Sequence, residues 1–310
     1  MNVSDITLVC GDHELVSSSV LDLCVHLDGE AFQRLADDYG IVWDGGKRVR
    51  GPVSHRVRFI PSSRAMIFAD GWPPPARMLA HGFHMCDRAF AEHVNSVIKN
   101  ARGDLILFKS IYDELRKSIE SVLGMRVVVD YDGAIQARRL FGVCDGECLP
   151  YVAWNHEMRA LFPLVLGVAD LLTDCIAGKA QSIEYVVFEF PEIGLSSKGL
   201  NLFVQIVFEL VANGHKVVIA TGSVDILYAM WMLENLQHTG QAADILEAVE
   251  WPKTSRCLDV AKKVLASDIS VNFFGDRSCS SVEECIDALT EQSSKFARIV
   301  ARCVNEGDAK

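Results

Sequence analysis

A strand, a helix and a second strand that follow one another between residues 184 and 221 constrain the fold more than any other feature. EYVVFEF (184–190) and KVVIAT (216–221) are short runs rich in β-branched and aromatic residues, which is typical of buried strands. The segment between them, 197–214, has helical periodicity and ends at Gly214. Two consecutive strands joined by a helix lie parallel in one sheet whose faces are both covered. The sequence therefore predicts an α/β fold with a largely parallel sheet.

The remaining elements follow from the same patterns. Apolar runs bounded by turn residues predict strands, alternation predicts hairpins, and apolar residues at helical spacing predict helices. These are a strand over 6–10 with a turn at 11–13 and a helix after it, β-hairpins over 40–66 and 125–140, and a buried helix over 160–177.

Two helical patterns, 77–101 and 108–123, come after the Pro-rich turn at 71–76 and carry many charged residues. We expect them to form an inserted helical lobe. The tail over 281–304 is amphipathic and is expected to form a helical cap.

Composition excludes two classes of protein and disfavours a third. With 50% apolar and 23% charged residues among 310, the chain is neither disordered nor fibrous. Its formal net charge of −11, from 41 acidic and 30 basic side chains, predicts that the surface repels phosphate backbones. General nucleic-acid binding is therefore disfavoured. A local patch remains an alternative, because basic residues lie on the predicted hairpins at 47–50, Arg56, Arg58, Arg138 and Arg139.

The N-terminal residues lack a basic stretch followed by an apolar core, so no secretory signal is expected and the predicted location is the cytoplasm. The most apolar long run, 217–233, contains Gly222 and Asp225 and is better explained by a strand and a helix than by a membrane span. The ten cysteines are accordingly expected to be free, mostly buried thiols.

Metal binding and cysteine–histidine catalysis are weakly indicated. Cys144 and Cys148 form one closely spaced pair, and His81, His84 and Cys86 form another group. Neither has a second ligand pair at the spacing usual for zinc, so no metal site is predicted. None of the cysteines lies in a recognisable nucleophile turn.

Five stretches together carry a resemblance that runs along nearly the whole chain. The chain resembles the ABC-type branch of P-loop ATPases, and in particular small stand-alone AAA-type, SMC-like proteins found beside effector genes in prokaryotic defence and toxin systems. That family has five features in chain order. They are a phosphate loop GxxxxGK[S/T] after a strand, a hairpin with a helical insertion, a serine-glycine signature before a buried helix, a strand ending in Glu-Glu-Pro-Glu and a strand ending in Thr-His-Ser. The corresponding text here is GDHELVSS (11–18), FIPSSR (59–64), NHEMRALFPL (155–164), FEFPEIGL (188–195) and ATGS (220–223).

The resemblance implies a P-loop, ABC-ATPase-like core with a largely parallel sheet, β-hairpins and an inserted helical lobe. It also implies a single composite domain over 1–310. Its expected parts are a core over 1–70 and 125–280, a helical insertion over about 71–124 and a helical cap over about 281–310.

The phosphate loop departs from the family's pattern at two positions that matter for chemistry. Gly11 and Ser18 match the first glycine and the hydroxyl residue, but Val16 stands for the second glycine and Ser17 for the lysine. The glycine lets the backbone wrap closely around phosphates and the lysine neutralises their charge. Losing the lysine forfeits charge-assisted hydrogen bonds worth roughly 1.5–3 kcal/mol each.

The other motifs have lost their catalytic groups as well. Glu189 stands where the family has the acid associated with magnesium, but Phe190 replaces the glutamate that activates water. A general base contributes about 10²–10⁴-fold to a rate, and a phenyl ring cannot act as one. Gly222 replaces the switch histidine, and NHEM at 155–158 lacks the serine-glycine pair. Taken alone, GDHELVSS is also explained by an ordinary strand-to-helix turn.

These departures predict a pseudo-ATPase with no catalytic residue and no bound cofactor. Gly11, Ser17, Ser18 and Glu189 would be vestigial nucleotide-binding positions. We expect a scaffold or regulatory subunit that holds a protein partner, as a homo- or hetero-oligomer, through the family's pairing surface, and no membrane association. Three alternatives stay open: a divergent ATPase that uses ATP and magnesium, a nucleic-acid-binding component, and an α/β protein unrelated to the family.

Overall fold

A computed structural model describes eleven parts of the chain, and every structural statement below concerns these parts. They are residues 4–11, 13–24, 57–68, 71, 85–100, 103–104, 112–132, 137–177, 183–239, 241–274 and 279–291.

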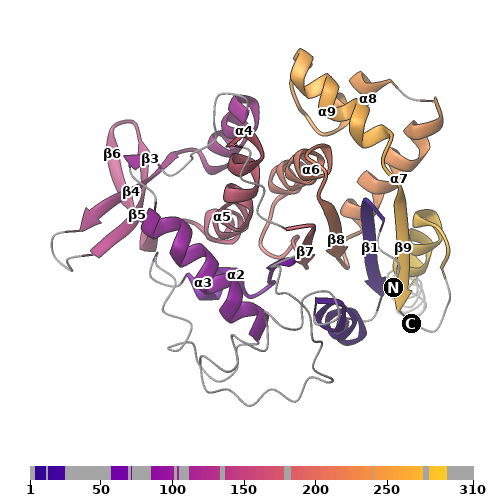
Figure 1. The fold of residues 1–310 in the computed structure, drawn as a ribbon, viewed down its shortest axis with the longest axis horizontal. Coiled ribbons are helices and arrows are strands. Elements are labelled where there is room, and N and C mark those ends of the chain that lie inside the picture. The colour runs from indigo at the N-terminus through magenta and orange to yellow at the C-terminus, as the bar shows by residue number, and fades with distance from the viewer. Residues whose placement is uncertain are drawn as a thin grey trace, which may run out of the picture.

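The centre of the fold is a parallel sheet of five strands (Figure 1). Strand β1 pairs with β8 on one side and with β9 on the other, and Ile6 lies opposite both Val217 and Ile269. On the far side of β8 come β7 and then β2, all in the same direction. The predicted α/β fold is confirmed. In spatial order the strands are β2 (Val57–Ile60), β7 (Tyr185–Glu189), β8 (Lys216–Ala220), β1 (Ile6–Gly11) and β9 (Ile269–Phe274).

A second, antiparallel sheet lies on the far side of α3 and α5 from β1 (Figure 1). Its strands β4 and β5 form the predicted hairpin, with Val128 opposite Phe141. The four strands in order are β3 (Gly103–Asp104), β4 (Arg126–Asp132), β5 (Ala137–Cys144) and β6 (Glu147–Pro150).

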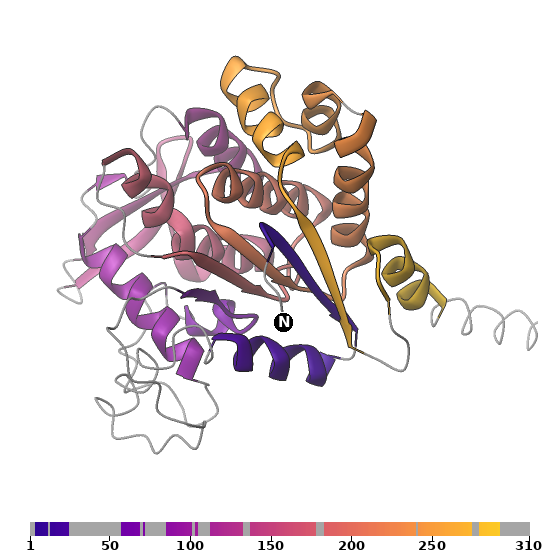
Figure 2. The same ribbon diagram turned by 45° about the vertical axis from the view of Figure 1, so that its right-hand side comes forward.

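Helices cover both faces of the parallel sheet, as its buried strands require. Alternate residues of each strand point to opposite faces, so Leu8 and Val186 join one buried cluster whereas Val9 and Val187 join a second. The second cluster includes the helix over 13–24, which lies on the opposite side of the sheet from α6 (Figure 2). The other helices are α2 (Arg64–Ile67), α3 (Met85–Asn100), α4 (Asp113–Leu123), a 3-10 turn (Tyr151–Ala153), α5 (His156–Ala177), α6 (Ser197–Ala212), α7 (Val224–Thr239), α8 (Ala242–Ala248), α9 (Ser255–Leu265) and the helix over 282–291.

The helices predicted as an inserted lobe contribute to the main core. Phe90 and Val94 on α3, and Leu115 and Ile119 on α4, belong to the same buried cluster as Leu8 of β1. Charged residues such as Glu92 and Lys99 on α3 and Lys117 on α4 are exposed, on the faces turned away from this core.

The strand over 57–60 was predicted as one arm of a hairpin, but its pairing in the structure is with β7, in parallel, with Phe59 opposite Val187. The other predicted arm, near residue 41, lies outside the described residues. Arg58 does not contribute to the predicted basic patch, because its side chain is buried. Its guanidinium donates to both carboxylate oxygens of Asp170, at 2.9 and 3.1 Å. Residues 47–50 and Arg56 lie outside the described parts.

A polar cluster of Arg58, His93 and Asp170 lies at the amino end of β2. Nε2 of His93 contacts the Arg58 guanidinium and lies 3.4 Å from Oδ1 of Asp170. Burial lowers the pKa of His93, and it also lowers the pKa of nearby His215. Burial alone would raise the pKa of Asp170, but hydrogen bonds from His93 and the charge of Arg58 hold it well below its usual value.

We expect the protein to lose stability as the pH falls below about 6.5, the ordinary pKa of histidine. Because the folded state favours neutral His93, the unfolded state binds the proton first, and stability present above that pH is lost as the pH falls through the folded pKa. Urea unfolding at pH 7.5 and pH 5.5 measures this loss, and His93→Gln should reduce it. An equal loss in the variant would show that His93 is not its source.

Candidate functional site

The junction between β1 and the next helix holds most of the predicted phosphate-loop positions. Strand β1 ends at Gly11, whose φ of 119° lies in a region that favours glycine. Asp12 is outside the described residues, and the helix already begins at residue 13. Ser17 and Ser18 are therefore helical, and their backbone N–H groups bond within the helix in the usual i to i−4 pattern. The described residues therefore pass from strand at Gly11 to helix at residue 13.

Val16 faces inward on this helix and is fully buried. It packs in the cluster that contains Val9 of β1, Val218 of β8 and Phe190, and Val20 lies one turn further along the same helical face. The side chain that replaces the family's second glycine is therefore part of the hydrophobic core.

Glu189, at the carboxyl end of β7, links three segments of the chain. Its Oε1 accepts a hydrogen bond from Oγ of Ser17 at 3.1 Å. Its Oε2 accepts from the backbone N–H and the hydroxyl of Ser62, at 3.1 and 2.8 Å. The structure thus brings the predicted residues Ser17 and Glu189 into contact, whereas Ser18 is exposed and Gly11 lies at the strand end.

Phe190 lies where the resemblance places the catalytic glutamate. It has a φ of 42°, which is unusual for a residue other than glycine, and its N–H donates to the carbonyl of Ala220 at 2.8 Å. Its buried ring stacks on the imidazole of His13, with ring centroids 4.0 Å apart and an interplanar angle of 7°. The ring therefore closes the space between β7 and the helix over 13–24.

Glu192 links the turn after β7 to the end of β8. Its Oε1 accepts from Oγ1 of Thr221 at 3.0 Å and from the backbone N–H of Gly222 at 2.9 Å. Its Oε2 is buried and has no hydrogen-bond partner among the described residues. A glutamate that the sequence assigned to a turn therefore occupies the place next to Gly222, the position of the family's switch histidine.

Arg64, on α2, links the backbone of several segments at the carboxyl edge of the parallel sheet. Its guanidinium is almost completely buried and donates to five carbonyl oxygens, at 2.7 to 3.4 Å. Burial lowers the pKa of Arg64 to about 10, and the nearby charges of Glu192 and Glu189 oppose that shift. The five acceptors belong to Pro61, Ala160, Phe190, Pro191 and Ile193.

Sequence reasoning did not select Ser62 and Arg64 as site residues, although both lie in the FIPSSR stretch. The signal that could have found them is their position directly after a strand. Groups at the carboxyl ends of parallel strands gather at one edge of the sheet.

Three large apolar side chains around this edge face solvent. Leu15 lies on the helix over 13–24, Met66 on α2 and Ile193 in the turn after β7, and they are 51%, 66% and 46% exposed. The segments that carry them are linked by the hydrogen bonds of Glu189 and Arg64. The edge thus combines a network of internal hydrogen bonds with three exposed apolar side chains, which we call the apolar rim.

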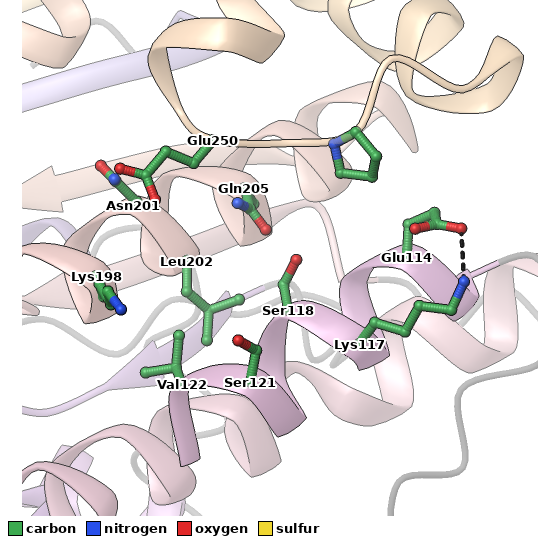
Figure 3. Close-up of a pocket in the computed structure, with 11 residues that line it drawn as sticks. Glu114, Lys117, Ser118, Ser121, Val122, Lys198, Asn201, Leu202, Gln205 and Glu250 are labelled. Carbon is green, nitrogen blue, oxygen red and sulfur yellow. Dashed lines mark hydrogen bonds and ion pairs between the residues drawn. The ribbon is translucent and has the colours of Figure 1, made fainter. Parts of the chain in front are cut away.

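A groove of about 300 Å³ lies elsewhere, between α4, α6 and the turn at 250–252 (Figure 3). Ser118 and Ser121 from α4 face Gln205 from α6 across it. Gln205 is buried and donates from Nε2 to the carbonyl of Val249 at 2.9 Å, while its Oε1 has no partner among the described residues. The predicted site residues do not line this groove.

The described residues contain no group of three or more His, Cys, Asp or Glu side chains arranged to hold a metal ion. Of the closely spaced residues that the sequence analysis considered, Cys144 and Cys148 are exposed, and His81 and His84 lie outside the described parts. None of the described helices has the length and apolar composition needed to cross a bilayer.

Comparison with known proteins adds no relative: no protein-family model matches the chain, and no curated protein matches it significantly.

Proposed function

We propose that this chain is a catalytically degenerate, ABC-ATPase-like protein that acts as a scaffold or regulatory subunit. In this proposal, the carboxyl edge of the parallel sheet holds a protein partner instead of ATP. The observation that carries the proposal is the helical backbone of residues 13–18, with Val16 fully buried beneath it. A phosphate loop needs an open backbone whose N–H groups point at the ligand.

The neighbouring polar groups support the same conclusion. The carboxylate of Glu189, which the family would use near magnesium, already accepts three hydrogen bonds from Ser17 and Ser62. His13 and Phe190 stack beside it. The residues at this edge therefore do not fit a nucleoside triphosphate bound in the family's manner, and we derive no hydrolytic step through one.

The apolar rim supports a protein partner. Leu15, Met66 and Ile193 are exposed on the segments that follow the carboxyl ends of β1, β2 and β7, the same edge at which Glu189 accepts hydrogen bonds from Ser17 and Ser62. Exposed apolar side chains grouped at one site are typical of protein interaction surfaces. The resemblance to proteins encoded beside effector genes is in keeping with such a regulatory role.

We expect millimolar ATP with magnesium to leave the melting temperature unchanged, because a ligand stabilises a protein only by binding its native state. Differential scanning fluorimetry with and without ATP and magnesium measures this. Isothermal titration calorimetry of the wild type and of Glu189→Gln is the second measurement. Micromolar binding that the substitution abolishes would overturn the proposal in favour of a divergent ATPase.

The partner side of the proposal has its own test. Cross-linking in cells and mass spectrometry should recover one partner with the wild type and lose it when Leu15, Met66 and Ile193 are all changed to serine. Val152→Ser is the matched control, because Val152 is 59% exposed and lies in the turn after β6. Equal recovery with both variants would exclude this edge as the binding surface.

A further inference from the structure

Three thiols from distant parts of the sequence meet beside the last described helix. Cys10 is the penultimate residue of β1, and Cys285 lies on the helix over 282–291; both are fully buried. Cys279 lies just before that helix and is partly exposed. The thiol of Cys285 makes hydrogen-bonding contact with the thiols of both Cys10 and Cys279.

A second set of contacts fixes Cys279 independently. Its Sγ lies 3.6 Å from the carbonyl oxygen of Glu284, the residue that precedes Cys285. The turn between them is held because Glu284 Oε2 accepts from the N–H and the hydroxyl of Ser280, at 2.6 and 2.9 Å. Ser281 caps the helix by accepting from the N–H of Glu284 at 3.2 Å. The turn therefore places the sulfur of Cys279 against the backbone of the residue before Cys285.

The three thiols differ in their exposure to solvent, which determines which of them an oxidant reaches first. Solvent reaches Cys279, whereas Cys10 and Cys285 are enclosed. An oxidant in solution can therefore reach the sulfur of Cys279 before it reaches the other two. The hydrogen bond to Cys10, together with burial, raises the pKa of Cys285, so this thiol stays protonated.

We propose that Cys279 and Cys285 form a redox pair that hydrogen peroxide, or another hydroperoxide, oxidises to a disulfide. The sulfur of Cys279 attacks the terminal peroxide oxygen, the O–O bond breaks, and Cys279 becomes a sulfenic acid while water, or the alcohol of an organic hydroperoxide, leaves with the thiol proton. The sulfur of Cys285 then attacks the sulfur of Cys279. The S–S bond forms, the S–O bond breaks, and the hydroxyl group leaves as water with the proton of Cys285. One peroxide is reduced and two thiols are oxidised.

Two other cysteines serve as a control, because they are exposed but are not expected to form a disulfide with each other. Cys144 and Cys148 are both exposed, on β5 and β6. Cys144 lies opposite Glu147, and Cys148 lies opposite Val143. Adjacent residues of a strand point to opposite faces, so these two thiols lie on opposite faces of the hairpin and are not placed to form a disulfide with each other.

The test treats the purified full chain with stoichiometric hydrogen peroxide, blocks free thiols and digests with trypsin. Cys279 and Cys285 fall in one tryptic peptide, 278–295, which should lose the mass of two hydrogens. A second digestion after glutamate cuts between Glu284 and Cys285, and the two halves should stay joined until a reductant is added. Cys279→Ser should abolish the disulfide, and Cys285→Ser should leave a sulfenic acid at Cys279 that dimedone traps.

Some results would overturn the proposal. These are a peptide 278–295 that stays reduced while Cys144 and Cys148 are oxidised, a disulfide between Cys10 and Cys285 with Cys279 free, or dimedone labelling of Cys279 that is as strong in the wild type as in Cys285→Ser. Circular dichroism confirms that each variant is folded before it is treated. The outcome does not depend on whether the chain binds ATP, so it tests this proposal separately from the proposed function.

Discussion

Replacing Arg64 with alanine is expected to lower the free energy of unfolding by roughly 3–5 kcal/mol, the range seen when one member of a buried charged network is removed. The guanidinium donates to five carbonyl oxygens and is only 1% exposed, so its removal takes a buried donor from each of them and leaves a cavity. Three of the acceptors lie in the turn that follows β7. The loss should therefore be accompanied by disorder of the site itself.

Urea unfolding measures the change, and two further variants make it interpretable. Arg64→Lys keeps a charge but offers three donors from a single nitrogen instead of a planar fork, so we expect an intermediate loss. Arg116→Ala is the matched control, because Arg116 makes partly exposed ion pairs with Asp113 and Glu120 on α4 and should cost less than about 1 kcal/mol. If Arg64→Ala lowered the free energy of unfolding no more than Arg116→Ala does, the hydrogen bonds of the Arg64 guanidinium would not be needed for stability.

The parts of the fold that could be predicted are those whose sequence carries a local pattern. Strands β1, β7 and β8 are central and buried on both faces, so their sequences consist mainly of apolar residues. Strand β9 was not predicted, because Ser270 and Asn272 interrupt the run in ISVNFF. Its place beside β1 comes from pairing between residues that are far apart in sequence, which no local pattern reveals.

The candidate site divides in the same way. Ser17 and Glu189 were chosen because a motif named them, and they are in contact. Arg64 was missed because its partners are backbone carbonyls, which every residue carries and which a sequence therefore cannot single out. The early start of the helix was equally invisible, since GDHELVSS is compatible with a loop and with a helix until the burial of Val16 is known.

Restoring the family's residues by Val16→Gly together with Ser17→Lys is expected to cost roughly 3 kcal/mol and to give no ATP binding. The glycine removes a fully buried side chain from the cluster with Val9 and Phe190, and it weakens the helix by about 1 kcal/mol. The lysine removes the hydrogen bond from Ser17 to Glu189. Neither change moves the start of the helix away from residue 13, so the backbone stays closed to phosphates.

Two measurements are made on each variant. Urea unfolding gives the loss in the free energy of unfolding, and the melting temperature with and without millimolar ATP and magnesium shows whether the variant binds ATP. Ser18→Gly is the matched control, because Ser18 is exposed on the same helix and should lose only about 0.5 kcal/mol of helix propensity. If the restored pair gained thermal stabilisation by ATP, the ligand would have to bind its native state, and the helix over 13–18 would have to open into a loop. That result would mean that two side chains, and not the backbone, prevent this chain from binding ATP.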